Sequence, residues 1–132
     1  MGEIGVPGAQ AWPLRVSMRS GSSAVVIALQ GQLDLSTRAL LTGEVVMALA
    51  QPASRPPAVI VDLSELVFCD SSGLSALIGA RWRMEAAGGR LVLAGARGMV
   101  ERLLRRTCLD HVFDCHQTVS DAEFALAAPS PA

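Results

Sequence analysis

The sequence predicts an α/β domain with a mostly parallel or mixed sheet of four to five strands and about four helices, in the order β-β-α-β-α-β-α-β-α. Short apolar stretches rich in β-branched residues recur along the chain, as in strands that are buried on both faces. Between them lie longer stretches whose apolar residues follow helical spacing. This alternation favours parallel strands joined by right-handed crossovers, while an initial hairpin adds an antiparallel edge.

The expected strands begin with a partly alternating segment that pairs with a continuously apolar one across the turn Gly21-Ser22-Ser23. Gly31 is expected to end the second strand. In chain order the five predicted strands cover residues 12–19, 24–29, 58–63, 91–94 and a short edge strand at 111–113.

The first predicted helix is capped by Ser36 and the last by Ser120, because serine side chains accept hydrogen bonds from free N–H groups at a helix start. Gly88 and Gly89 stop the second helix. Trp82, within that helix, is interpreted as half-buried core, with a partner anchor as the alternative. The four helices are expected at residues 37–51, 71–87, 97–106 and 121–127.

Composition indicates one intracellular domain, with residues 12–127 as its body and flexible tails at 1–11 and 128–132. Its 132 residues are 51% hydrophobic and 17% charged, with a net charge of −1, which excludes a disordered chain and does not favour nucleic acid. All 11 basic residues are arginine, so Schiff-base and P-loop chemistry, which require lysine, are excluded. Three scattered cysteines indicate free thiols in a reducing cytoplasm. No signal peptide or membrane-length apolar stretch is seen, so no direct membrane insertion is expected.

Two loops at the carboxyl ends of predicted parallel strands are the candidate site, residues 31–36 and 65–72, because function in such sheets lies at this edge. The second loop runs into Asp70-Ser71-Ser72-Gly73-Leu74, where two serines open a helix. The first turn of a helix has free N–H groups and the positive end of its dipole, so a phosphoserine there is tolerated by the fold. Gly73 leaves room for another molecule to approach. The alternative is that Asp70, Ser71 or Ser72 is simply a helix cap.

The sequence here resembles the STAS domain family, and within it the bacterial anti-sigma factor antagonists. The resemblance rests on Phe68-Cys69-Asp70-Ser71-Ser72-Gly73-Leu74, preceded by Leu63, and on Gly31-Gln32-Leu33-Asp34. The family commonly has glutamate where this chain has Gln32. The resemblance runs from about residue 12 to residue 127, which is nearly the whole chain.

The resemblance implies a switch protein without catalytic activity or cofactor. Its unphosphorylated form would bind an anti-sigma factor that is also a serine kinase, and so release a sigma factor. Phosphorylation of Ser72 would end that binding, and a serine phosphatase would restore it. The partner surface would comprise Asp34, Ser36, Asp70, Ser71 and Gly73, on a monomer or weak dimer. The alternative is a STAS interaction module that works without phosphorylation in a transport or sensory complex.

Three other interpretations are weaker. A metal site would have to use ligands whose spacing does not match the usual zinc patterns, namely Cys108, His111, Cys115 and His116. A serine hydrolase would need a nucleophile elbow, which the sequence around Ser72 lacks. A basic cluster on the third predicted helix is interpreted as a solvated face; it consists of Arg102, Arg105 and Arg106.

Overall fold

The computed structural model of the protein describes residues 13–51 and 57–128. The predicted N-terminal tail, Trp12, residues 52–56 and, of the predicted C-terminal tail, residues 129–132 lie outside the described residues. In chain order the elements are β1 (Leu14–Ser20), β2 (Val25–Leu33), α2 (Arg38–Leu49), β3 (Ala58–Cys69), α3 (Ser71–Ala86), β4 (Arg90–Ala94), α4 (Gly98–Arg106), the short 3-10 helix η1 (Leu109–His111), β5 (Asp114–His116) and α5 (Val119–Ala127).

The strands form one mixed sheet in the order β1-β2-β3-β4-β5. The predicted initial hairpin is confirmed, because β1 and β2 pair antiparallel, with Val16 opposite Leu29. The pairs β2–β3, β3–β4 and β4–β5 are all parallel. The predicted α/β class and its alternating element order are therefore confirmed.

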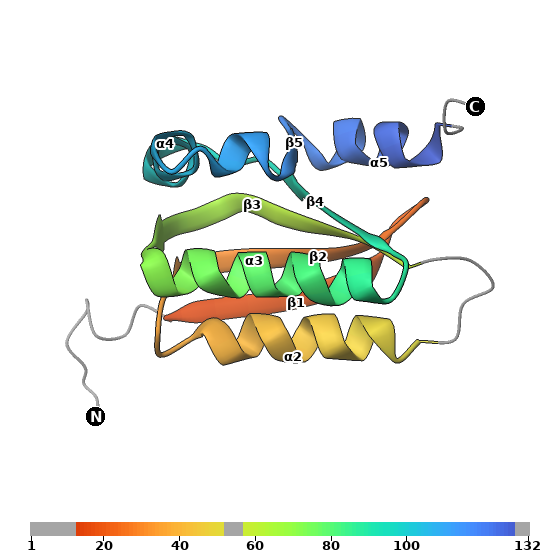
Figure 1. The fold of residues 1–132 in the computed structure, drawn as a ribbon, viewed down its shortest axis with the longest axis horizontal. Helices are drawn as coiled ribbons and strands as arrows, with labels where there is room; N and C mark the ends of the chain where they lie inside the picture. The colour runs from red at the N-terminus through yellow and green to blue at the C-terminus, as the bar shows by residue number, and fades with distance from the viewer. Residues whose placement is uncertain (1–12, 52–56, 129–132) are drawn as a thin grey trace, which may run out of the picture.

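Both faces of the central strands are buried, which explains their continuous apolar sequences. Val26 and Ile27 point to opposite faces of β2, yet both are fully buried. Ile27 belongs to the larger core, to which α2, α3 and α4 contribute side chains. Val26 belongs to a smaller core on the other face, together with Ala122 of α5. Figure 1 shows α2 and α3 side by side against one face of the sheet, away from α5.

The two strands that lead to the candidate site are longer than predicted. Gly31 does not end its strand: β2 continues to Leu33, and Gly31 adopts a φ of 113° where the register with β3 is irregular. Glycine adopts this backbone conformation without the steric cost of a β-carbon. The predicted loop at 65–72 is also wrong in its first part, because β3 continues to Cys69, which is opposite Leu33.

Two predicted helix caps are replaced by neighbouring threonines. Thr37, rather than Ser36, is the N-cap residue of α2, but its buried hydroxyl makes no capping bond and instead donates to the Gln32 carbonyl at the end of β2. Thr118, rather than Ser120, caps α5, because its Oγ1 accepts a hydrogen bond of 3.0 Å from the N–H of Asp121. Ser120 is the second residue of that helix and is exposed.

Two further predictions are wrong: one concerns the segment that follows α4, and the other concerns the burial of a side chain on α3. The predicted edge strand at 111–113 is wrong: the chain forms η1 there, and the last strand begins at Asp114. Phe113 instead fills the main core, with 3% of its surface exposed. Trp82 is not half-buried core, because 64% of its surface is exposed.

Candidate functional site

The two candidate loops lie side by side because they follow the ends of adjacent parallel strands. Leu33 and Cys69 are paired at the ends of β2 and β3, so Asp34 and Asp70 leave the sheet next to each other. The N–H of Asp70 donates a hydrogen bond of 3.4 Å to the carbonyl of Leu33, which ties one loop to the other. The structure thus brings together the two segments that the sequence singled out.

Asp70 is the N-cap residue of α3, which decides among the three cap candidates. Its Oδ1 accepts a hydrogen bond of 2.9 Å from the N–H of Gly73, and its backbone is extended. Its carbonyl accepts the first helical bond, from the N–H of Leu74, at 2.9 Å. Ser71 and Ser72 are therefore the first and second residues of the helix and are not needed as caps.

The hydroxyls of both serines are uncommitted. Ser71 is exposed and Ser72 is half-buried, and neither side chain hydrogen-bonds to any of the residues that the structure describes. Both lie in the first turn of α3, where the helix dipole favours negative charge. A phosphate on either oxygen would therefore sit at an electrostatically favourable end of the helix.

Gly73 is required by packing within the chain. A β-carbon at Gly73 would overlap the carbonyl oxygen of Leu33 and would lie 2.7 Å from Sγ of Cys69. The room that this glycine leaves is therefore filled by its own chain, and Gly73 is buried. The close contact allows α3 to begin directly against the end of β2.

Asp34 organises the first loop. Its Oδ1 accepts hydrogen bonds from the N–H and Oγ of Ser36, at 3.0 and 2.8 Å, and from Oγ1 of Thr37 at 3.2 Å. The Ser36 hydroxyl contributes most to lowering the pKa of the Asp34 carboxyl below its usual value, helped by the N–H groups of Ser36 and Thr37 and by the Thr37 hydroxyl, while partial burial opposes the shift. Asp34 is thus a carboxylate at neutral pH.

Thr37 is a site residue that the sequence analysis missed. Only 3% of its surface is exposed, and its Oγ1 donates to the carbonyl of Gln32 at 2.9 Å and accepts from the N–H of Asp34, also at 2.9 Å. It therefore holds the turn that presents Asp34 and Ser36. A threonine three residues after an aspartate is a local pattern that could have indicated this role.

An exposed apolar rim borders the two loops, and it was also missed. Leu35 follows Asp34, and Val67 and Phe68 precede Cys69 and Asp70 at the end of β3. Leu35 and Val67 leave about two thirds of their surfaces exposed, at 66% and 67%. Exposed apolar side chains grouped around polar ones are typical of a surface that binds another protein.

Neighbouring groups offer other chemistry little support. Burial, together with the charge of Asp70, raises the pKa of the Cys69 thiol to about 12, so it is not a nucleophile at neutral pH.

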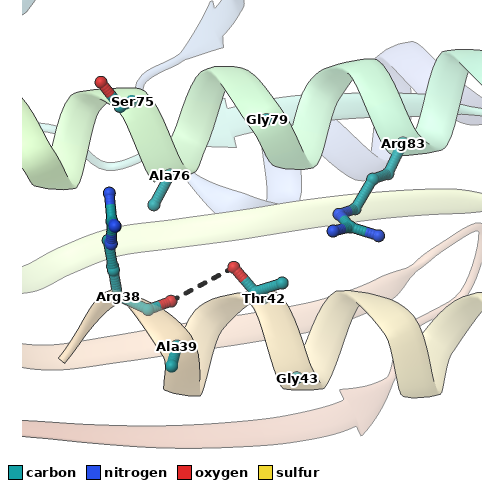
Figure 2. A pocket seen from close by; sticks show the side chains of 8 residues that line it. All are labelled: Arg38, Ala39, Thr42, Gly43, Ser75, Ala76, Gly79 and Arg83. Carbon is teal, nitrogen blue, oxygen red and sulfur yellow. Dashed lines mark hydrogen bonds between the residues drawn. The ribbon is translucent and has the colours of Figure 1, made fainter.

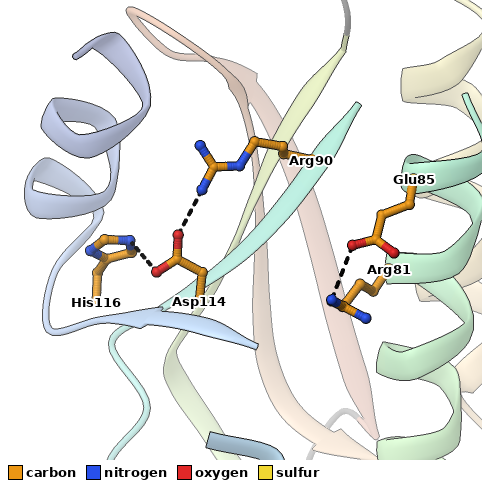
Figure 3. Close-up of polar contacts among 5 residues, drawn as sticks. All are labelled: Arg81, Glu85, Arg90, Asp114 and His116. Atoms are coloured by element: carbon orange, nitrogen blue, oxygen red, sulfur yellow. Dashed lines mark hydrogen bonds and ion pairs between the residues drawn. The ribbon is translucent and has the colours of Figure 1, made fainter. Parts of the chain in front are cut away.

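His116 lies 3.3 Å from Asp114, which also bonds Arg90 at 2.8 Å, as Figure 3 shows. The Arg90–Asp114 pair joins β4 to β5, and the His116–Asp114 contact lies within β5. Within the described ranges, no group of three or more His, Cys, Asp or Glu side chains could hold a metal ion.

This strand order, with a capped helix that opens on two serines beside the end of β2, is that of a STAS-like fold. The chain belongs to the STAS domain family, whose model matches residues 15–122. None of the helices in the described part is both long and apolar enough to cross a membrane.

Three solved structures illustrate the range of relatives. An anti-sigma factor antagonist from Mycobacterium paratuberculosis is 26% identical, over 87% of this chain and 95% of that chain, with a TM-score of 0.74. Unphosphorylated SpoIIAA, from Bacillus, is 23% identical over 89% of this chain and 100% of its own, with a TM-score of 0.71. The murine Slc26a9 anion transporter is 16% identical and has a TM-score of 0.71, but the match covers 84% of this chain and 19% of the transporter chain.

Proposed function

We propose that this protein is an anti-sigma factor antagonist that works by partner switching. Its unphosphorylated form binds an anti-sigma factor with serine kinase activity and so releases a sigma factor. That kinase phosphorylates Ser72, binding is lost, and a serine phosphatase restores the first state. In this proposal the chain is a binding protein rather than an enzyme, and it acts in the cytoplasm.

The observation that carries the proposal is the position of Ser72. Its hydroxyl has no hydrogen-bond partner in the described part of the chain, while Asp70 already caps the helix. Ser72 can therefore be modified without breaking any side-chain hydrogen bond that the described structure shows at the start of α3. A serine needed for capping would lose its acceptor geometry when phosphorylated, and the helix start would be weakened.

The phosphorylation step itself needs only this hydroxyl. Oγ of Ser72 attacks the γ-phosphorus of ATP that is bound to the kinase, the bond to the ADP oxygen breaks, and the hydroxyl proton passes to the kinase or to water. All of the nucleotide chemistry belongs to the partner. The substrate contributes a hydroxyl with no hydrogen bond to the described residues, at the start of a capped helix.

Charge explains how the modification would end binding. A phosphoserine carries a charge of about −1.5 to −2 at neutral pH. It would join the carboxylates of Asp34 and Asp70 on one small surface, so the face that the partner contacts would become strongly negative. A partner surface that complements the neutral serine offers no cation to the phosphate, and an unpaired charge at an interface weakens the binding free energy.

The apolar rim explains why binding would be sensitive to this change. A partner that covers Leu35 and Phe68 must also exclude water from the nearby start of α3. A phosphate there keeps its hydration shell and occupies the space of the partner's side chains. The two loops therefore combine apolar surface for affinity with a hydroxyl that can be switched.

The test is a pull-down from native-host lysate with wild-type, Ser72→Ala and Ser72→Glu baits, followed by incubation of the captured kinase with ATP. We expect wild type and Ser72→Ala to capture an anti-sigma-type serine kinase, Ser72→Glu to lose it, and the phosphate to map to Ser72 by mass spectrometry. Ser120→Glu is the matched control, because Ser120 is likewise the second residue of a capped helix. Capture of the kinase by all four baits would refute the switch.

A second candidate function is a STAS module that binds its partners without phosphorylation. It is favoured by the fold match to an anion transporter of which this fold forms only a small part. In that case all four baits would capture the same membrane or sensory protein, and no phosphate would appear on Ser72.

A further inference from the structure

A groove runs between α2 and α3, on the side of these helices that faces away from the sheet. Small residues on both helices open it: Ala39 and Gly43 on α2, and Ala76 and Gly79 on α3. A β-carbon added at either glycine would meet no atom within 4 Å, so the groove is open at both positions. Its volume is about 530 Å³.

Two arginines point into the groove from opposite helices. Figure 2 shows Arg38, at the start of α2, reaching toward α3 beside Ser75, and Arg83 of α3 reaching toward α2 at the other end. Neither guanidinium has an ion-pair or hydrogen-bond partner among the described residues. The acidic residues of these helices do not line the groove, and one of them, Glu85, is already paired with Arg81 at 3.0 Å. The groove is therefore positively charged.

Exposed apolar side chains border the same helices. Met47 lies one turn beyond Gly43, and Trp82 lies three residues beyond Gly79, so both fall near the Arg83 end of the groove by helical spacing. More than half of the surface of each is exposed. Tryptophan and arginine are among the residues enriched at the energetic hot spots of protein interfaces.

We infer that this groove binds an amphipathic acidic helix of a partner protein. Its carboxylates would pair with Arg38 and Arg83, and its apolar face would cover Trp82 and Met47. The groove begins one helical turn beyond Ser72, at Ser75 and Ala76, and the inference does not depend on phosphorylation.

The spacing of the two arginines defines the ligand further. Arg38 is level with Ser75, and Arg83 lies eight residues further along α3, a rise of about 12 Å at 1.5 Å per residue. Carboxylates two turns apart on a helix are separated by about 11 Å. Because the residues between the two arginines have small side chains, a partner helix can approach closely enough for each of its two carboxylates to pair with an arginine.

The probe is a synthetic amphipathic helical peptide with two glutamates two turns apart. The control is the same peptide with glutamine at both positions. Binding is followed by the fluorescence of Trp82 in a Trp12→Phe background, so that one tryptophan reports. We expect the acidic peptide to shift the emission to the blue, to bind at least about tenfold more tightly than the glutamine peptide, and to weaken as salt rises.

Three variants test the location. Arg38→Gln with Arg83→Gln removes the charge, and Gly79→Leu fills the groove while leaving the charge. We expect each to weaken binding at least about tenfold. Arg105→Gln on α4 is the matched control and should bind like wild type, because Arg105 does not line the groove. Circular dichroism verifies that each variant is folded.

The inference is overturned if the acidic peptide does not bind, if the glutamine peptide binds equally well, or if the groove variants bind like the control. Competition by inorganic phosphate at the same concentration as the peptide would also overturn it, because the site would then hold a small anion instead of a helix. None of these outcomes bears on Ser72, whose test uses phosphorylation and kinase capture.

Discussion

The α-carbon of Gly73 lies so close to the backbone of Leu33 that a β-carbon would overlap the Leu33 carbonyl oxygen. We expect Gly73→Ala to lower the free energy of unfolding by about 1–3 kcal/mol, because the start of α3 must shift away from β2. Urea denaturation measures this.

Gly79→Ala is the matched control for that prediction, since it makes the same change in the same helix. Its β-carbon would enter open space, so alanine should raise the free energy of unfolding by about 0.5–1 kcal/mol. Equal effects at Gly73 and Gly79 would show that the contact with Leu33 is unimportant.

The carboxylate of Asp70 should contribute to the free energy of unfolding only through the hydrogen bond that it accepts from the Gly73 N–H. Asp70→Ala removes the acceptor of the Gly73 N–H and should cost about 1 kcal/mol in thermal or urea unfolding. Asp70→Asn keeps an acceptor oxygen and should cost much less. A loss as large for asparagine as for alanine would contradict the assignment of Asp70 as the cap.

A negative charge at Ser72 should leave the fold intact. We expect Ser72→Glu to change the free energy of unfolding by less than about 1 kcal/mol, because the helix dipole offsets repulsion from the nearby carboxylates. Leu77→Glu, on the buried face of the same helix, should unfold the protein and so shows the sensitivity of the measurement. Unfolding of Ser72→Glu would mean that lost binding reflects lost structure.

The Asp34 carboxyl should titrate below its usual pKa, and Ser36→Ala should move that pKa upward. A pKa that is lower in the folded chain than in the unfolded chain adds stability above the unfolded value, and this is lost as pH falls through the folded pKa. Carboxyl ¹³C chemical shifts measured between neutral and acid pH follow the titration. Ser17→Ala on β1 should leave it unmoved, and a pKa insensitive to Ser36→Ala would exclude the serine as the cause.

The three cysteines should differ in reactivity. Cys69 is buried with a pKa raised to about 12, so it should react with a thiol reagent only after unfolding. Cys108 and Cys115 are exposed. Burial, with the charges of Asp110 and Asp114, raises the pKa of Cys115, so we expect it to react more slowly than Cys108. Rapid labelling of Cys69 in the native protein would disprove its burial.

The sequence was sufficient to predict the element order and the meeting of the two loops, because parallel strands place their carboxyl ends at one edge of the sheet. It did not predict that β2 and β3 run on to Leu33 and Cys69. Their last residues mix polar and exposed apolar side chains, and only the pairing of one strand with the other makes them strands.

The residues that were missed depend on tertiary contacts. The position of Thr37 three residues after Asp34 indicates its bond to the Asp34 N–H, but its bond to the Gln32 carbonyl depends on how β2 ends, which the sequence did not predict. Trp82 was assigned to the core on the usual behaviour of tryptophan, whereas its side of α3 is uncovered. The usual burial of a residue type is overridden by the tertiary context, which leaves this side of α3 exposed.

The unequal lengths of the strands have a consequence for dynamics. β3 pairs with β4 only from Ala58 to Asp62, but it pairs with β2 as far as Cys69, so the last part of β3, the tip that leads to the candidate site, extends past β4 and is paired on one side only in the described structure. Backbone amides near Phe68 should therefore exchange with solvent through local opening, at a lower free energy than those near Ile60. A bound partner would suppress this opening. Amide exchange at the tip would therefore slow when the site is occupied, while the exchange rates in the rest of the domain would not change.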